Sequence, residues 1–344
     1  MSSIASPTLW LVTIGVVLAL LVVDFIATRR PHEVSMKEAL AWSAFYVALP
    51  LTFGLYVWNV HGGDRGLEYY TGYLVEKTLS VDNLFVFMLL LAAFAVPEVL
   101  KQRVLLYGII GALVLRAIFI ALGAAALSRF DWVFLVFGAV LLVTGVKMLR
   151  DAVRGEEHQV DVGEMRLVRL MRRVMPVSDD YDGARLTVVR DGVRALTPFA
   201  LVTVAVLGTD IVFAVDSVPA VYGITGDPYL VFVTNAFALL GLRALYFVLE
   251  GALSALVHLS YGLAAILGFI GFKLVLHWAH LVWPSVPDVP TLTSLFVIVG
   301  ILATTVTTSL LANRRQRSAG GTSGAGSTGG VDDADGVEDE VGVR

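Results

Sequence analysis

The stretch Glu76-Lys-Thr-Leu-Ser-Val-Asp82-Asn83 is matched further along the chain by Asp210-Ile-Val-Phe-Ala-Val-Asp216-Ser217. In both stretches the two acids stand six residues apart, and a valine precedes the second acid. Both stretches lie inside long apolar segments, where acids are scarce. A carboxylate at the centre of a membrane helix costs about 2.5 to 3.5 kcal/mol even on the most lenient insertion scale, so these acids indicate a function.

Two further triplets match between the same parts of the chain: Leu115-Arg116-Ala117 with Leu242-Arg243-Ala244, and Gly145-Val146-Lys147 with Gly271-Phe272-Lys273. The two copies cover about residues 67–150 and 197–281, and each contains three predicted helices. Because three is an odd number, the second copy enters the membrane from the opposite side. The matches therefore predict a 3+3 inverted-topology repeat, an arrangement of secondary transporters in which the substrate site lies near the midplane where the copies meet.

Composition places the chain among membrane proteins. Of its 344 residues, 57% are apolar and 16% are charged, whereas soluble domains carry about 25% charged residues. Apolar segments long enough to cross a hydrocarbon core of about 30 Å recur along the sequence. We expect an all-α polytopic membrane protein with about nine transmembrane helices, near residues 7–28, 38–60, 67–95, 101–127, 131–150, 197–221, 228–256, 259–281 and 291–312. The chain has no cysteine, which excludes disulfides and thiolate-bound metals.

Lysine and arginine residues predict the orientation, because they collect in cytoplasmic loops. Alternate loops contain Arg29, Arg30 and Lys37, then Lys101 and Arg103, then the basic residues from Arg150 to Arg194, and finally Arg314, Arg315 and Arg317. The loops between them contain little more than Arg65 and Arg129. Nine spans with the N-terminus outside and the C-terminus in the cytoplasm agree with every basic loop. We expect a multi-pass protein of a bacterial-type plasma membrane.

The sequence divides into a transmembrane domain, residues 1–315, and a cytoplasmic tail, residues 316–344. The tail is rich in Gly and Ser and then acidic, a composition that cannot build a core, so we expect it to be disordered. The one long internal loop, about residues 151–196, is expected in the cytoplasm. Within it, residues 165–174 alternate apolar and basic side chains at helical spacing, which fits a helix on the membrane surface and a solvated helix on the bundle equally well.

The candidate metal ligands are the polar residues of the two acidic stretches: Glu76, Asp82, Asn83, Asp210, Asp216 and Ser217. Two acids six residues apart on one helix diverge by about 120° and lie about 9 Å apart along its axis, so one helix cannot place both on one ion. An inverted repeat brings one acid of each copy together. By position in their spans, Glu76 and Asp210 are expected near the midplane, with Asp82 displaced inward and Asp216 displaced outward.

Further oxygen ligands are expected beside these acids. Pro219 cannot donate to the carbonyl of Val215, which leaves a bare backbone oxygen near Asp216. The side chain of Asn235 is a candidate accessory ligand. Carboxylates, amides, a hydroxyl and a free carbonyl form an all-oxygen set, which suits hard ions such as Mg²⁺, Ca²⁺ or Mn²⁺ rather than Zn²⁺ or Cu⁺.

Four basic residues inside the spans are candidate counter-charges: Arg116, Arg243, Lys147 and Lys273. In an alternative interpretation they neutralise the acids in buried pairs that orient helices and move nothing. A mixed arrangement, with some acids paired and others free for an ion, is also open. Asp24 and Glu250 stand near span ends and are expected at the membrane interface. The sequence contains no phosphate-binding loop, nucleophile elbow or zinc-protease motif, so we do not expect an enzyme.

Three motifs carry a resemblance to a known family: the two acidic stretches, extended to Phe87 and to Pro219, and the stretch Thr234-Asn235-Ala-Phe-Ala-Leu-Leu-Gly-Leu-Arg243-Ala-Leu-Tyr-Phe247. They resemble the TerC family of integral membrane proteins over about residues 5–312. The resemblance implies tellurite resistance, manganese export or metal supply to exported enzymes, and kinship with the lysine-exporter superfamily. It implies that the residues of the acidic stretches serve efflux of Mn²⁺ or a related cation, with no permanently bound cofactor.

The expected partners are the lipid bilayer, a divalent cation, and a second copy of the chain or another membrane protein, and no nucleic acid. Direct tellurite transport fits poorly, because this dianion would meet carboxylates, so resistance would be indirect. Two rival functions stay open. One is a non-transporting membrane partner that docks a resistance or secretion complex through residues 151–196. The other is an oxyanion or amino-acid-type exporter that uses Arg116 and Arg243.

Overall fold

The computed structural model describes residues 3–27, 35–155, 166–178, 180–190, 193–249 and 258–322. Its helices are α1 (Pro7–Ala27), α2 (Met36–His61), α3 (Gly63–Ala93), α4 (Glu98–Leu127), α5 (Trp132–Arg154), α6 (Arg166–Val174), α7 (Pro198–Tyr222), α8 (Pro228–Leu240), α9 (Leu242–Leu249), α10 (Leu259–Val282) and α11 (Thr291–Thr322). Two short strands, β1 (Thr187–Arg190) and β2 (Val193–Leu196), form an antiparallel hairpin in which Thr187 pairs with Leu196.

Seven of the described helices are long and apolar enough to cross a membrane: α1, α2, α4, α5, α7, α10 and α11. The pair α8 and α9 adds an eighth span if its two halves are counted together. Helix α3 has 31 residues, but its charged side chains make it too polar to be counted with them. The all-α polytopic architecture is therefore confirmed, whereas the count of nine spans stays a prediction.

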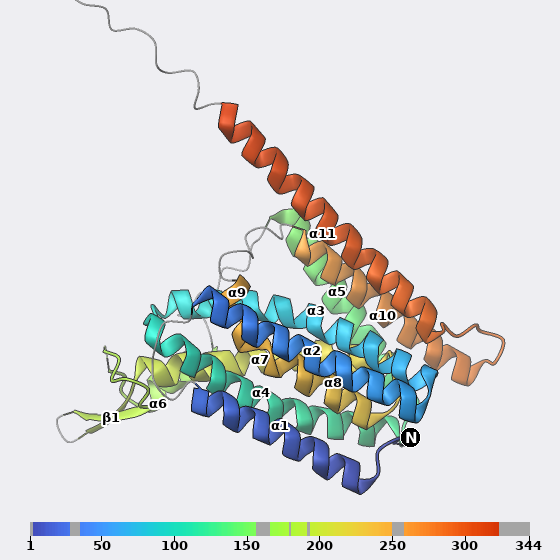
Figure 1. Ribbon diagram of the computed structural model, residues 1–344, viewed down its shortest axis with the longest axis horizontal. Helices are drawn as coiled ribbons and strands as arrows, with labels where there is room; N and C mark the ends of the chain where they lie inside the picture. Colours follow the sequence, from blue (N-terminus) through green and yellow to red (C-terminus); the bar gives the residue numbers. More distant parts are fainter. Residues whose placement is uncertain are drawn as a thin grey trace, which may run out of the picture.

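The helices form two groups in Figure 1. Helices α1, α2, α3, α4, α7 and α8 run side by side, and α5, α10 and α11 cross them as a tilted second group. At the centre of the first group, α3 and α4 each contact both α7 and α8. This centre contains the acidic stretches of α3 and α7, whose polar residues predicted to matter are buried, except for the half-buried Asp216.

The helices α5 and α10 approach each other closely through glycines. A Cβ atom on Gly138 would lie 2.8 Å from the carbonyl oxygen of Gly271, and a Cβ atom on Gly271 would lie 2.9 Å from the carbonyl oxygen of Gly138. A Cβ atom on Gly145 would likewise lie 3.1 Å from the carbonyl oxygen of Ala264. Small residues allow membrane helices to pack backbone against backbone, and here they join α5 and α10, two of the three helices of the second group.

The single span expected over residues 228–256 is broken, which corrects that prediction. Helix α8 ends at Leu240, α9 begins at Leu242, and the two are bent by 43°. Gly241 stands at the break, where a Cβ atom would lie 3.0 Å from Cβ of Tyr46 and 3.2 Å from Nζ of Lys77. Tyr46 of α2 and Lys77 of α3 can therefore lie this close to the break because Gly241 has no side chain. Residues 250–257, which include Glu250, lie outside the described residues.

Part of the long segment 151–196 is also described. Helix α6 packs against α7, and its Val168 is buried. The hydroxyl of Tyr181 donates to the carbonyl oxygen of Phe94 at 2.8 Å, and burial raises the pKa of Tyr181 to about 12. The segment is thus attached to the ends of α3 and α7. Helix α11 continues to Thr322, and the remaining tail residues, like Arg29 and Arg30, lie outside the described residues.

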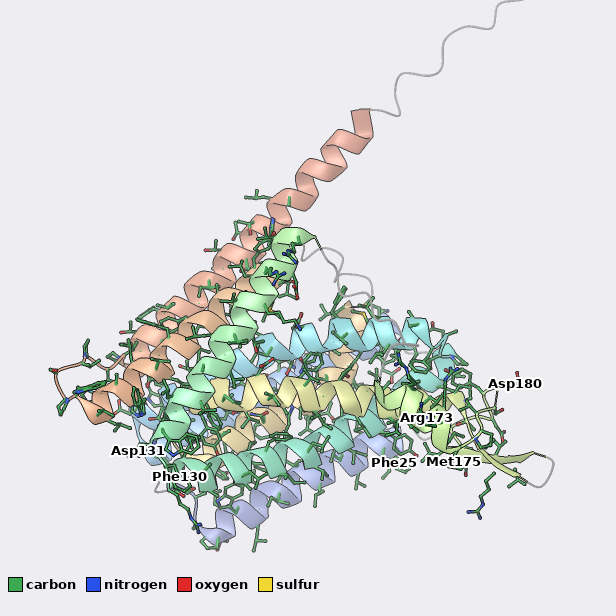
Figure 2. The ribbon with its side chains drawn as sticks, turned by 180° about the vertical axis from the view of Figure 1, so that it is seen from behind. Phe25, Phe130, Asp131, Arg173, Met175 and Asp180 are labelled. Atoms are coloured by element: carbon green, nitrogen blue, oxygen red, sulfur yellow. The ribbon has the colours of Figure 1, made fainter. Side chains whose placement is uncertain are left out.

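Figure 2 shows which connections share an end of the molecule. Phe130 and Asp131, between α4 and α5, lie at one end of the bundle. Arg173, Met175 and Asp180 lie at the opposite end, on the same side as Phe25 near the end of α1. The segment after α5 and the connection before α5 are therefore on opposite ends of the bundle.

Candidate functional site

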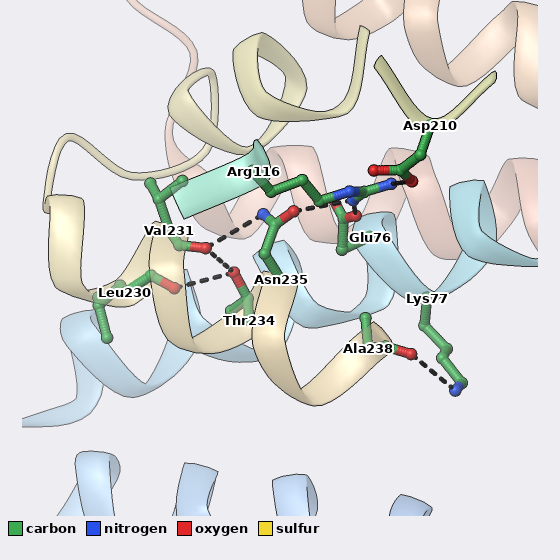
Figure 3. Close-up of polar contacts among 9 residues, drawn as sticks. All are labelled: Glu76, Lys77, Arg116, Asp210, Leu230, Val231, Thr234, Asn235 and Ala238. Carbon is green, nitrogen blue, oxygen red and sulfur yellow. Dashed lines mark hydrogen bonds and ion pairs between the residues drawn. The ribbon is translucent and has the colours of Figure 1, made fainter. Parts of the chain in front are cut away.

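The first acids of the two stretches meet at Arg116. This residue comes from α4 and donates from Nη1 to Glu76 of α3 and from Nη2 to Oδ1 of Asp210 of α7, the latter at 3.3 Å. Nη1 also donates to Oδ1 of Asn235 of α8 at 2.9 Å. Figure 3 shows the guanidinium group pointing between these three side chains. None of the four residues is more than 1% exposed. The four central helices therefore each contribute one member to this buried Arg116 cluster.

Neighbouring amides fix the position of Arg116. The nitrogen of Asn235 donates to the carbonyl oxygen of Val231 at 3.1 Å, which leaves its oxygen facing Arg116. Asn83 makes a similar pair when its amide nitrogen donates to the carbonyl oxygen of Leu79 at 3.0 Å. Its oxygen then accepts from Nη2 of Arg116, also at 3.0 Å. Both amides use a helix carbonyl to orient an acceptor toward the guanidinium.

The charges in the Arg116 cluster do not balance, because two carboxylates face one guanidinium. Oε2 of Glu76, Oδ2 of Asp210 and Nε of Arg116 are buried and have no hydrogen-bond partner among the described residues. A buried polar group without a partner costs about 1–3 kcal/mol. The cluster is thus held together by Arg116 while two carboxylate oxygens keep the capacity to accept a cation or a proton.

The second acids of the two stretches border a cavity. Asp82 and Asp216 line a space of about 160 Å³ where α3, α5 and α7 meet. Oγ1 of Thr144 donates to Oδ1 of Asp216 at 2.8 Å. The other polar residues that line the cavity are Asn83, Ser217, Lys147 and Asp151. This volume is enough for a cation together with several waters.

The cavity offers oxygen ligands but no crowded acidic cluster. Among the described residues, no three acidic or histidine side chains lie close enough together to hold a metal ion. An ion of the Mg²⁺ type needs no such cluster, because it keeps several waters and binds through one or two carboxylates. Asp82 and Asp216 can supply those two carboxylates, and the amide of Asn83 and the hydroxyl of Ser217 can supply further oxygens.

The structure thus divides the four motif acids into two pairs. Glu76 and Asp210 lie in the Arg116 cluster, whereas Asp82 and Asp216 line the cavity. This division follows from the divergence of two acids six residues apart on a helix. Asp82 and Asp216 border the same cavity, and the expectation that Asp82 is displaced inward and Asp216 outward stays a prediction.

Two of the expected counter-charges lie away from the motif acids. Arg243 of α9 binds Asp24 of α1, with Nη2 2.5 Å from Oδ1 and Nε 3.0 Å from Oδ2. Asp24 is 3% exposed and lies three residues before the end of α1, and its expected location at the membrane interface stays a prediction. Lys273 is buried, and the carboxylates that act on it electrostatically are those of Glu68 and Asp288.

Sequence reasoning did not single out Thr144, Asp151 or Lys77. Thr144 and Asp151 stand three residues before and four residues after Lys147, so the three share one face of α5. From that spacing, the sequence could have predicted that Thr144 and Asp151 lie beside Lys147 at one site. Lys77 donates from Nζ to the carbonyl oxygen of Ala238 at 3.4 Å, beside the break between α8 and α9 (Figure 3). Lys77 could have been singled out because it is a charged residue inside a long predicted helix.

The fold and the central residues together define a multi-pass helical membrane protein with acidic and basic side chains at its centre. The model of the integral membrane protein TerC family matches residues 61–317, and the chain belongs to this family. The sequence is 42% identical over 313 residues to an uncharacterized membrane protein of Myxococcus xanthus, covering 91% of this chain and 95% of the relative. No solved structure matches the chain.

Two further relatives are similar over most of the chain. An uncharacterized membrane protein of Mycobacterium tuberculosis is 44% identical over 277 residues, which are 80% of this chain and 70% of the relative. A protein of Escherichia coli, Alx, is 39% identical over 333 residues, which are 93% of this chain and 100% of the relative. The name of that protein proposes a role as a membrane-bound redox modulator. These relatives support the location in a membrane and leave the function to be argued from the site.

Proposed function

We propose that the chain is a secondary transporter that exports Mn²⁺ or a related divalent cation from the cytoplasm. The observation that carries this proposal is that Asp82 and Asp216, one from each acidic stretch, border a single cavity. Two carboxylates with amide, hydroxyl and water oxygens suit a hard divalent cation. In this proposal Glu76 and Asp210, held in the Arg116 cluster, lie along the ion path beside the cavity. Tellurite resistance is then an indirect result of metal homeostasis.

The proposed architecture has nine spans, an inverted repeat, the N-terminus outside and the C-terminus in the cytoplasm. In the repeat, α3 corresponds to α7, α4 to α8 and α5 to α10. The contact between α4 and α7 then corresponds to the contact between α8 and α3, and both contacts are present. The offset that aligns Gly145 with Gly271 also aligns Gly138 with Ala264, so the Gly138–Gly271 contact corresponds to the Ala264–Gly145 contact. These correspondences support a two-fold relation between the copies, with the ion path where they meet.

The rival functions have less support from the geometry. An oxyanion exporter would need an arginine whose charge is not already matched by carboxylates, but Arg116 faces two carboxylates and Arg243 binds Asp24. A redox role of the kind that the Alx name proposes would have to work without thiols, because this chain has no cysteine. No catalytic motif supports an enzyme. The non-transporting partner is best separated from a transporter by experiment.

The test is the manganese content of cells that lack their own exporter and are challenged with MnCl₂. The cells express the parent chain, Asp82→Asn, Asp216→Asn or Asp131→Asn at matched levels. Asp131→Asn is the matched control, because this exposed acid lies between α4 and α5 and its side chain makes no capping hydrogen bond to α5. We expect the parent and Asp131→Asn to lower the manganese content, and the two cavity variants to leave it high.

Each other outcome contradicts a defined part of the proposal. If no variant changes the content of any metal, the chain is not a metal exporter and the docking role gains support. If Asp82→Asn and Asp216→Asn both export like the parent, transport does not use the cavity. Elemental analysis of the same cells shows whether another divalent metal moves in place of manganese.

A further inference from the structure

Asp24 is a buried charge that the proposed function leaves unused. It is the only charged residue between Pro7 and Ala27, in a helix that is otherwise apolar. A carboxylate kept inside a membrane helix indicates a function rather than chance. Its two oxygens accept from Nη2 and Nε of Arg243 at 2.5 and 3.0 Å. A two-point contact of this kind fixes both the distance and the relative orientation of the two groups.

Arg243 stands directly beyond the break between α8 and α9, at the second position of α9. Its remaining donor, Nη1, lies 3.3 Å from Oε1 of Gln102 on α4. Arg243 is 4% exposed, so the contact with Asp24 is made in a dry environment. The short helix α9 is therefore attached to α1 and α4 by a single buried arginine.

At its other end, α1 is attached to the beginning of α8. The backbone nitrogen of Ile4 donates to Oδ2 of Asp227, the N-cap residue of α8, at 2.6 Å. The hydroxyl of Thr13 lies 2.7 Å from that of Tyr229, and the ring of Trp10 packs edge-on against the Tyr229 ring at 5.1 Å between centroids. Helix α1 thus contacts the chain on both sides of the break, as its course along the bundle in Figure 1 allows.

The angle at this break affects the centre of the protein. Asn235, on α8, accepts from Arg116 at 2.9 Å. The carbonyl oxygen of Ala238, closer to the break, accepts from Lys77, which is the neighbour of Glu76 in α3. A change in the angle between α8 and α9 therefore displaces groups that contact the Arg116 cluster.

We propose that α1 braces the broken span, and that Asp24 is the positioning residue that sets the angle between α8 and α9 and so the position of Asn235 against Arg116. Helix α1 lies outside both copies of the repeat, so the brace acts on the transport machinery without being part of it. The effect on manganese export rests on the proposed function, whereas the effect on the angle does not. The test therefore measures both.

The absence of cysteine allows spin labels to be introduced without removing native thiols. One label is attached at Leu249→Cys, at the end of α9, and the other at Val99→Cys, an exposed position of α4. The distance distribution is measured by double electron–electron resonance in lipid nanodiscs. We expect a broader and shifted distribution for Asp24→Asn, with several-fold lower manganese export. Asp24→Glu, which keeps the carboxylate, should stay closer to the parent, and Asp131→Asn should match it.

An unchanged distribution in folded Asp24→Asn overturns the proposal, whatever happens to export. If Asp24→Asn does not fold, the double variant Asp24→Asn with Arg243→Gln removes both buried charges, and an unchanged distribution there overturns it equally. A residue that serves only stability would lower the yield of folded protein and leave the distances in the folded fraction the same. A broader distribution in a protein that moves no manganese would support the brace and reject the proposed function.

Discussion

The single residue on which the centre depends most is Arg116. Its guanidinium is the counter-charge of two carboxylates that are almost completely buried. Removing one partner of a buried ion pair leaves an uncompensated charge, which costs about 3–5 kcal/mol. We therefore expect Arg116→Met to lower the free energy of unfolding by an amount in this range, measured by denaturant titration in detergent.

Arg129→Met is the control for that measurement. Arg129 is an exposed arginine just after α4, and changes at such sites usually alter stability by less than about 0.5 kcal/mol. Adding Glu76→Gln to Arg116→Met should recover part of the loss, because it removes one of the two uncompensated carboxylates. If Arg116→Met is as stable as the parent, the carboxylates are not ionised together in the folded protein.

Single residues also show how far the sequence could predict the site. The acids were found because a charge inside an apolar segment is rare and costly. Arg116 was among the candidate counter-charges, and it pairs with Glu76 and Asp210, as the mixed arrangement of paired and free acids allowed. Arg243 was a candidate too, but it binds Asp24 instead of a motif acid. Arg243 binds Asp24 of α1, and a contact across 219 residues leaves no local signal.

At the scale of elements, long apolar segments predicted the helices well, but not the break between α8 and α9. A lone glycine is common in membrane helices and does not by itself end one. At the break, Tyr46 and Lys77 of other helices approach Gly241 closely. Such a break is a property of the packing, so only the assembled structure reveals it.

The packing of α5 against α10 gives a prediction at the same scale. Gly271→Ala would place a methyl group 2.9 Å from the carbonyl oxygen of Gly138, and backbone cannot move aside as a side chain can. Overpacking of this kind costs about 1–3 kcal/mol. We expect a correspondingly lower free energy of unfolding, measured as for Arg116→Met.

Gly268→Ala on the same helix is a close control. A Cβ atom there meets nothing within 4 Å, and alanine in a helix is favoured over glycine by about 0.8–1.0 kcal/mol. This variant should therefore be as stable as the parent or slightly more stable. Equal losses for Gly268→Ala and Gly271→Ala would show that helix α10 is sensitive to any side chain, and that the contact with Gly138 is not the reason.

For the whole molecule, the open question is how many times the chain crosses the membrane, because apolarity alone does not count α3 and counts α8 with α9 only as a pair. The charges at the centre make α3 polar, and the break at Gly241 shortens α8, so hydropathy alone does not decide whether these two segments cross the membrane. Figure 2 places the connection before α5 and the segment after it at opposite ends. That arrangement makes the topology testable from a few exposed positions.

Three single cysteines in the cysteine-free chain decide the count: Ser128→Cys after α4, Thr187→Cys in β1 and Ser285→Cys after α10, all at exposed positions. In right-side-out membrane vesicles, nine spans expose Ser128→Cys and Ser285→Cys to an impermeant maleimide, whereas Thr187→Cys reacts only after permeabilisation. If α3 does not cross, Ser128→Cys becomes protected, because α4 then starts outside. If α8 and α9 form a re-entrant loop, Ser128→Cys stays reactive and Ser285→Cys alone becomes protected. Only the first pattern gives the two copies opposite orientations, which the proposed ion path between them requires.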